Sequence, residues 1–106
     1  MTDDVLLVIT TFADEESARR ICREIVTENL AACANILPAI HSIYRWENKV
    51  EEAPETMAFF KTTAARFPEL QARVTSLHSY DVPEIIAVNV TAGLPDYLRW
   101  VAASCA

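Results

Sequence analysis

The sequence predicts an α+β fold in which helices cover one face of a small sheet, and three observations support this. Apolar strand-like runs and amphipathic helical patterns follow one another in the order β-α-β-β-α-β, with one more helix at the end. The chain has 106 residues, which suits a single domain over residues 1–106. The two middle strands form an unusually long hairpin. This order is typical of the ferredoxin-like split βαβ sandwich, in which both crossover helices pack on one sheet face.

The first strand and the first helix follow from their side-chain patterns. Residues 5–12 form a continuous apolar run with β-branched residues, as expected for a buried strand. Asp14 is placed to cap a helix, with Glu15 and Glu16 in the first turn. One stripe of this helix faces the core and the other side is charged. The stripe consists of Ala18, Ile21, Cys22, Ile25 and Asn29.

The hairpin is the most informative feature of the chain. Residues 33–46 and 50–62 predict its two strands, and Asn48 suits the left-handed position of a tight turn at Glu47-Asn48-Lys49. Pro38 and Pro54 favour bulges or edge positions in these strands. A strand of about 14 residues at ~3.3 Å per residue spans ~45 Å. A domain of this length is only ~35 Å across.

The hairpin is therefore expected to extend beyond its own domain. An isolated two-stranded ribbon is marginally stable in water, and this one carries exposed aromatic residues and open edges. Pairing with other copies of the chain resolves both problems. We expect Tyr44 and Trp46 to pack in the interface between these copies.

The remaining elements have clear boundaries. A second helix begins at Ala64 or Phe67, with Pro68 tolerated in its first turn, and ends before the loop at residues 78–83. Residues 85–90 form a further apolar strand, and residues 93–96 open the last helix. The apolar stripe of the second helix consists of Phe67, Leu70, Val74 and Leu77.

Charge and hydropathy argue against two classes of partner. The formal net charge is −6 at pH 7, so the basic surface that nucleic acids require is missing. No apolar run is long enough to span a membrane, and residues 1–12 lack the basic region of a secretory signal peptide. We therefore expect neither a nucleic-acid nor a membrane partner.

Cysteine usage and motifs bear on compartment and activity. Cys22, Cys33 and Cys105 are odd in number and form no CxxC pair, which fits the reducing cytoplasm better than a disulfide framework. Cys22 and Cys105 lie on apolar helix stripes and are expected to fill the core. No GxSxG, phosphate-loop or HExxH motif occurs, and a nucleophilic pair of Cys33 and His78 lacks an oxyanion-hole signature. The sequence predicts a cytoplasmic protein that is not an enzyme.

Four segments resemble a known family. They are LAACANILP at 30–38, SIYRWENKVEEAPETMAFFKT at 42–62, HSYDVPEIIA at 78–87 and DYLRW at 96–100. On these segments, which cover nearly the whole chain in order, the sequence resembles the CutA family of divalent-cation tolerance proteins. The resemblance implies a ferredoxin-like subunit assembled into a tight homotrimer through the long hairpins. It also implies a role in the tolerance of divalent metals, copper above all.

The resemblance makes Cys33, His78 and Glu84 the candidate metal ligands. They offer thiolate, imidazole and carboxylate donors, which suit copper and other divalent cations. Their spacing is long and irregular, so they do not form a sequence motif. Each also has a structural interpretation. In this interpretation His78 caps the second helix and Cys33 packs as a small apolar side chain. Glu84 bonds to a backbone N–H or to a lysine.

Two positions depart from the family pattern. Some members carry a cysteine where this chain has Thr10 and a second histidine where it has Leu77. Copper sites proposed for the family use such positions, so a three-ligand site of that kind is largely missing. The resemblance therefore implies that Cu(II) or another divalent cation binds weakly or between subunits, and that folding requires no cofactor.

A second constellation matches characteristic positions of the family and consists of Tyr44, Trp46, Lys61, Tyr80, Asp81, Tyr97 and Trp100. Of these, Lys61, Tyr80, Asp81 and Trp100 are the candidates for a ligand cleft. Aromatic walls with one cation and a carboxylate describe a small-molecule cleft between subunits better than a metal cage. Lys61 lies in a strand that should otherwise be buried, so it needs a partner or a ligand. The alternative is that the aromatic residues pack the interface and Lys61 pairs with Asp81 or Glu84.

Two functions follow from these residues. The first is a cytoplasmic homotrimer for divalent-metal tolerance that binds copper or another cation weakly or at an intersubunit site. The second is a trimeric regulator of the PII type that binds a small metabolite in the cleft between subunits.

Overall fold

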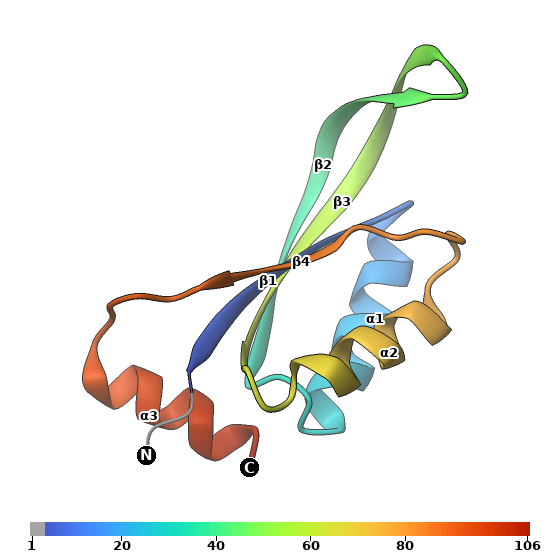
Figure 1. Cartoon of the computed structure of the whole chain (residues 1–106). Coiled ribbons are helices and arrows are strands. Elements are labelled where there is room, and N and C mark those ends of the chain that lie inside the picture. Colours follow the sequence, from blue (N-terminus) through green and yellow to red (C-terminus); the bar gives the residue numbers. More distant parts are fainter. Residues whose placement is uncertain (1–3) are drawn as a thin grey trace.

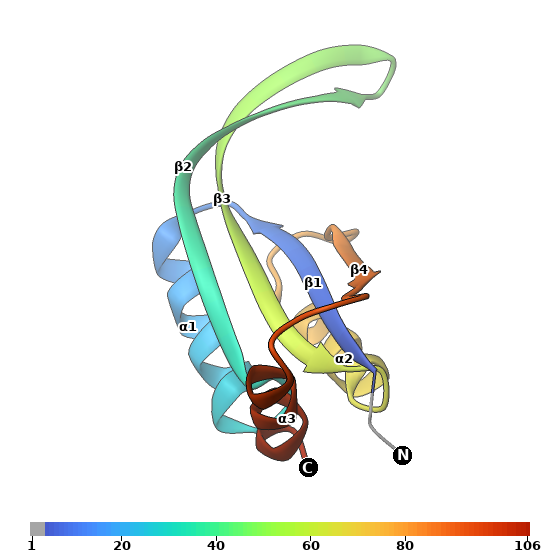
Figure 2. The same cartoon turned by 90° about the vertical axis from the view of Figure 1, so that its left-hand side faces the viewer.

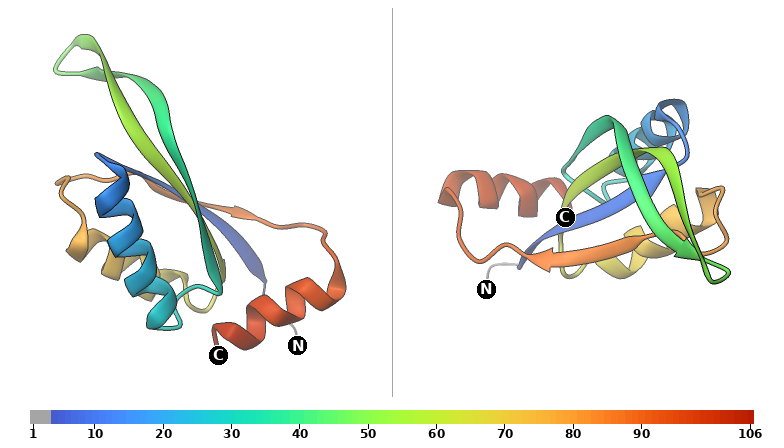
Figure 3. Two further views of the ribbon diagram at one scale, coloured as in Figure 1. Left: turned by 180° about the vertical axis from the view of Figure 1, so that it is seen from behind. Right: turned by 90° about the horizontal axis from the view of Figure 1, so that it is seen from above.

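The computed structural model describes residues 4–106, which form a four-stranded antiparallel sheet and three helices (Figure 1). The elements are β1 (Val5–Phe12), α1 (Glu15–Thr27), β2 (Cys33–Trp46), β3 (Lys49–Thr63), α2 (Phe67–Leu77), β4 (Ile85–Asn89) and α3 (Pro95–Ser104). The strand order is β2-β3-β1-β4, and α1 and α2 cover the same face of the sheet (Figure 3). The predicted ferredoxin-like α+β class is confirmed.

Local hydrogen bonds set both ends of α1. Asp14 Oδ1 accepts from the backbone N–H of Ser17 at 2.7 Å and from its hydroxyl at 2.6 Å, and these bonds lower the pKa of Asp14. At the other end Asn29 adopts a φ of 61°, and Leu30 N–H donates to Ile25 O at 3.1 Å. Asn29 therefore belongs to the turn after the helix and not to the apolar stripe on which it was expected. The other four stripe residues are buried.

The turn and the bulge of the hairpin follow from the backbone at four residues, three with a positive φ and one a proline. Glu47 and Asn48 have φ values of 49° and 66°, and Trp46 pairs directly with Lys49. The turn thus has two residues, as in a type I′ hairpin, and the predicted inclusion of Lys49 was wrong. In β2 the register shifts between Leu37 and Ile40, where Ala39 has a φ of 61° beside Pro38. The bulge expected at Pro38 is confirmed.

The hairpin of β2 and β3 extends well beyond the end of β1. β1 pairs with β3 only as far as Thr56, opposite Phe12, so residues 40–55 form a ribbon of two strands (Figures 1 and 2). Pro54 lies in this part, where β3 has a single neighbour. The described chain measures 47 × 25 × 22 Å. The predicted overhang is therefore present.

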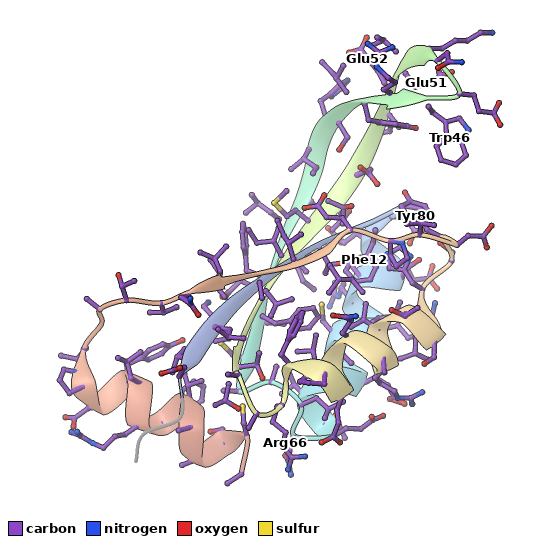
Figure 4. The ribbon with its side chains drawn as sticks, in the orientation of Figure 1. Phe12, Trp46, Glu51, Glu52, Arg66 and Tyr80 are labelled. Carbon is purple, nitrogen blue, oxygen red and sulfur yellow. The ribbon has the colours of Figure 1, made fainter. Side chains whose placement is uncertain are left out.

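The main core lies between the sheet and the two covering helices. Burying each large side chain there contributes roughly 1.5–3 kcal/mol. The core is built from Leu6, Val8, Phe12, Phe60, Ile21, Ile25, Leu70 and Val74. A smaller cluster under α3 contains Val5, Ala32, Val101 and Cys105. Arg66, labelled in Figure 4, donates from Nε to Cys105 O at 2.7 Å and ties the end of α3 to the start of α2.

The second face of the sheet is largely uncovered. Among the described elements only α3 packs on it, at the end where β2 begins (Figure 2). From β4 to β2, one row on this face consists of Val88, Leu7, Lys61 and Cys33, and the next of Ile86, Ile9, Phe59 and Asn35. Leu37, Ile86 and Val88 remain 50%, 50% and 49% exposed. An apolar sheet face of this kind is suited to contact with another protein surface.

None of the helices in residues 4–106 is long and apolar enough to cross a membrane.

Replacing Thr10 by valine is expected to stabilise the fold. Thr10 is fully buried, and within residues 4–106 its Oγ1 is the buried side-chain atom that has no hydrogen-bond partner. Removing this hydroxyl in a nearly isosteric change should raise the free energy of unfolding by about 1–2 kcal/mol. Urea unfolding at fixed protein concentration measures the change.

Thr62→Val is the matched control. Its equally buried hydroxyl donates to Leu30 O at 2.6 Å, so the same substitution should lower the free energy of unfolding by about 1 kcal/mol. Equal effects of the two substitutions would contradict this account of Thr10.

Candidate functional site

The three candidate metal ligands do not come together within one chain. Cys33 pairs with Lys61, which pairs with Leu7 on β1, whereas the ring of His78 bonds to the carbonyl oxygen of Thr11. Leu7 and Thr11 are four residues apart, which corresponds to ~13 Å along a strand. Over residues 4–106 no group of three histidine, cysteine or acidic side chains is close enough to hold a metal ion.

His78 uses both of its ring nitrogens. Nε2 lies 2.7 Å from Thr11 O, and Nδ1 lies 3.0 Å from the backbone N of Tyr80. A carbonyl oxygen only accepts and a backbone N–H only donates, so Nε2 carries the proton and Nδ1 is the acceptor. The predicted capping role is also present, because His78 N–H donates to Val74 O at 2.9 Å at the end of α2. A metal ion at Nδ1 would have to displace the N–H of Tyr80.

A small aromatic cluster surrounds His78. Its ring stacks on Phe12 at 4.9 Å and an interplanar angle of 13°, and lies 4.7 Å from the ring of Tyr80. Figure 4 labels Phe12 and Tyr80. The hydroxyl of Tyr80 donates to Glu55 Oε2 at 2.7 Å. These contacts join the end of α2, the end of β1 and the base of the hairpin overhang. Phe12, Thr11 and Glu55 were not anticipated, because only the tertiary arrangement brings them to His78.

Asp81 and Glu84 lie on the loop between α2 and β4. Both are exposed, and neither takes part in an ion pair among the described residues. Glu84 directly precedes β4, which is an edge strand. The alternative pairing of Lys61 with Asp81 or Glu84 was wrong for the single chain, because Lys61 Nζ donates to Asn35 Oδ1 instead.

The second constellation is divided between the two ends of the sheet. Tyr80 and Asp81 lie near the base of the overhang, while Lys61 lies beside the start of β2, near α3. There, Cys33 Sγ is 3.6 Å from the hydroxyl of Tyr97, and the Tyr97 and Trp100 rings are 5.5 Å apart. The bond to Cys33 and partial burial raise the pKa of Tyr97.

Asn35 was missed by sequence reasoning. Residues 33 and 35 lie on one strand face, but the register of the hairpin decides that Cys33 is opposite Lys61 and that Asn35 is opposite Phe59, in the adjacent row. That register includes the bulge, which the sequence suggests but does not place to the residue.

The thiols differ in environment. Burial raises the pKa of Cys22 to about 12 and also raises the pKa of Cys105. A thiol must be deprotonated to ligate metal or act as a nucleophile, so both residues are poorly suited to either role. Both are buried, as expected for core positions, whereas Cys33 is half-buried beside Tyr97.

An open groove of about 590 Å³ runs between α1 and β2. Arg19, Arg20 and Arg23 line one side of it, and residues 32–34 and Ile36 line the other. The groove excludes His78 and Lys61, so it is separate from both clusters described above.

The two residues expected at a subunit interface are exposed in the single chain. Tyr44 is 44% and Trp46 61% exposed, and Figure 4 shows Trp46 near the hairpin tip, away from the helices. A large aromatic side chain this exposed gains little from the rest of its own chain.

Comparison with known proteins gives consistent matches. The family model described as CutA1 divalent ion tolerance protein matches residues 6–104. The divalent-cation tolerance protein CutA of Thermus thermophilus is 46% identical over 95 residues, 90% of this chain and 92% of that protein. The chloroplastic CutA of Arabidopsis thaliana is 40% identical over 96 residues, 91% of this chain and 53% of that protein. The crystal structure of CutA from Xylella fastidiosa has a TM-score of 0.95 at 42% identity and covers 97% of this chain and 99% of that chain.

Tyr80 gives stability a defined dependence on alkaline pH. Burial, and then the bond to Glu55, raise the pKa of Tyr80 from an ordinary value of 10 to about 12. The folded protein thus holds this proton more tightly than the unfolded chain, so its contribution is complete below pH ~10 and is lost as the pH rises towards 12. Absorbance at the tyrosinate band should show a late step that Tyr80→Phe reduces by one tyrosine, leaving the contribution of Tyr97, whose pKa is also raised. Tyr44→Phe is the control and should keep the full late step. If the late step fell in Tyr44→Phe and not in Tyr80→Phe, its assignment to Tyr80 would be contradicted.

Proposed function

The chain belongs to the CutA1 family of divalent ion tolerance proteins, and we propose that it serves divalent-metal tolerance as a cytoplasmic homotrimer that binds copper or another divalent cation without enzymatic turnover. The supporting observation is the position of the candidate donors. Cys33 begins one edge strand and Glu84 directly precedes the other, so within one chain they lie at opposite edges of the sheet. This separation supports a metal site formed between subunits.

Assembly is supported by what a single chain leaves uncovered. The ribbon beyond β1 has no third strand, and Ile43, Trp46 and Val50 on it are 67%, 61% and 65% exposed. The outer edges of β2 and β4 are also unpaired among residues 4–106. Pairing the β2 edge of one copy with the β4 edge of the next is a head-to-tail contact, which forms a closed ring when the rotation closes. A ring of three is what the family resemblance implies.

Such a ring would place the metal donors between subunits. Glu84 of one copy would approach the β2 edge of its neighbour, where Cys33 lies. His78 would ligate through Nδ1 once Tyr80 N–H leaves it, and this also frees the loop that carries Glu84. Breaking that bond costs free energy, and Thr10 and Leu77 supply no strong donor, so binding should be weak.

Three free cysteines support the cytoplasmic location, because reduced thiols persist there. The chloroplastic label in the name of one relative refers to that protein.

Equilibrium dialysis with Cu(II) tests the metal proposal. The assembled protein should take up Cu(II), and a Cys33→Ala, His78→Ala double variant should lose that uptake because it removes the thiolate and imidazole donors. His41→Ala is the matched control, since His41 is the other histidine and is exposed on the hairpin, so its uptake should equal that of the wild type. Uptake no greater than that of the double variant would contradict the proposal.

Trp46→Ala tests the assembly. In a single chain Trp46 is 61% exposed, so its truncation would cost little. If hairpins bury it against neighbours, the loss should be on the order of 3–5 kcal/mol and should appear as subunit dissociation. Light scattering over a dilution series measures this, with Lys49→Ala as a control at the paired position. A Trp46→Ala protein that remains fully assembled on dilution argues against burial of this side chain.

Binding of a small metabolite in the trimer is a second candidate function. It is favoured by Lys61, a half-buried cation that has no carboxylate partner among residues 4–106. A half-buried cation without a carboxylate partner is suited to bind a negatively charged group of a small ligand.

A further inference from the structure

Lys61 is the one cation in its two rows of the uncovered sheet face. Its neighbours across the strands are Leu7 and Cys33, and the next row along the strands contains Ile9 and Phe59. Lys61 is half-buried, and its hydrogen-bond partner among the described residues is Asn35 Oδ1. A partly desolvated ammonium group on an apolar surface is costly without a counter-charge. The position therefore favours an anion supplied from outside the chain.

The polar groups around Lys61 have free donors. Asn35 uses Oδ1 to accept from Lys61, so its NH₂ group is left with two N–H donors. Cys33 and Tyr97 share one hydrogen bond of 3.6 Å between Sγ and the hydroxyl oxygen. Their two polar hydrogens make one bond, so one remains to donate. Ammonium, amide and hydroxyl or thiol donors together are complementary to an oxyanion.

The charge and shape of the site select the class of anion. Lys61 supplies one positive charge, which balances a monoanion, whereas a doubly charged phosphate would leave uncompensated charge on a partly apolar surface. The ring of Tyr97 lies 5.5 Å from the ring of Trp100, and Trp100 is 46% exposed. These rings offer a wall for an apolar or aromatic ligand body.

We propose that Lys61, Asn35 and Tyr97 bind the carboxylate of a small organic acid, with Trp100 against its apolar part. The inference rests on the small-molecule function proposed above and names its ligand class. The site shares Cys33 with the proposed metal donors, because Cys33 pairs with Lys61 and contacts the hydroxyl of Tyr97. It is separate from His78, which lies at the opposite end of the sheet from Lys61.

Calorimetric titration of the assembled protein with benzoate tests the inference. Benzamide has the same ring without the charge, and inorganic phosphate has the charge without the ring. Benzoate should bind at least about tenfold more tightly than either probe, because only it satisfies both Lys61 and the aromatic wall. Lys61→Met should weaken benzoate at least about tenfold. Lys49→Met is the control and should bind like the wild type, since Lys49 is the only other lysine and lies on the exposed hairpin.

Tyr97→Phe is a second variant that removes a donor while keeping the ring, and it should weaken benzoate several-fold. It keeps the test valid if Lys61→Met does not assemble. The inference would be overturned if either Tyr97→Phe or Lys61→Met bound benzoate as tightly as the wild type does. It would also be overturned if the wild type bound benzamide as tightly as benzoate. Phosphate binding that needs Lys61, without benzoate binding, overturns the carboxylate class and leaves the small-molecule function standing. Absence of binding by all three probes at ~10 mM overturns the site itself.

Discussion

The unequal length of the paired strands is the constraint on which the rest of the structure depends. β3 has 15 residues and β1 has 8, so about half of β3 and its partner β2 project without a third strand. A β-ribbon leaves backbone groups on its edges and places apolar side chains on both faces, and the helices of this chain do not reach that far. The uncovered sheet face adds apolar area below the ribbon. Edge, ribbon and face thus leave backbone groups and apolar side chains that contact with another protein surface would cover.

The sequence predicted the elements because their signals are local. Capping by Asp14, the restriction imposed by Pro38 and the continuous apolar run of β1 act within a few residues, and each has its expected structural effect. The errors concern single positions, where backbone conformation decides. Two successive left-handed residues shorten the hairpin turn and return Lys49 to the strand, and Asn29 adopts the same conformation to end α1.

The sites were less predictable because they depend on register and strand direction. Two residues of β2 oppose one of β3 at the bulge, and this offset decides which side chains face Lys61. Sequence alternation alone therefore could not single out Asn35. The separation of Cys33 from His78 has the same origin, since residues far apart in sequence meet or part according to where along β1 their elements join it.

His78 shows how a structural and a binding role exclude each other at one atom. Its Nδ1 lone pair either accepts the N–H of Tyr80 or coordinates a metal ion, and the first state holds the loop on the aromatic cluster that ends at Glu55. Displacing that N–H frees a backbone donor and the segment leading to β4, which is one of the two unpaired sheet edges. In the proposed metal site, the affinity of His78 for a metal ion would therefore be linked to the state of this edge. A neighbour that pairs with β4 and holds the loop in the displaced conformation would raise the affinity, because it would already have met the cost of breaking the Tyr80 bond.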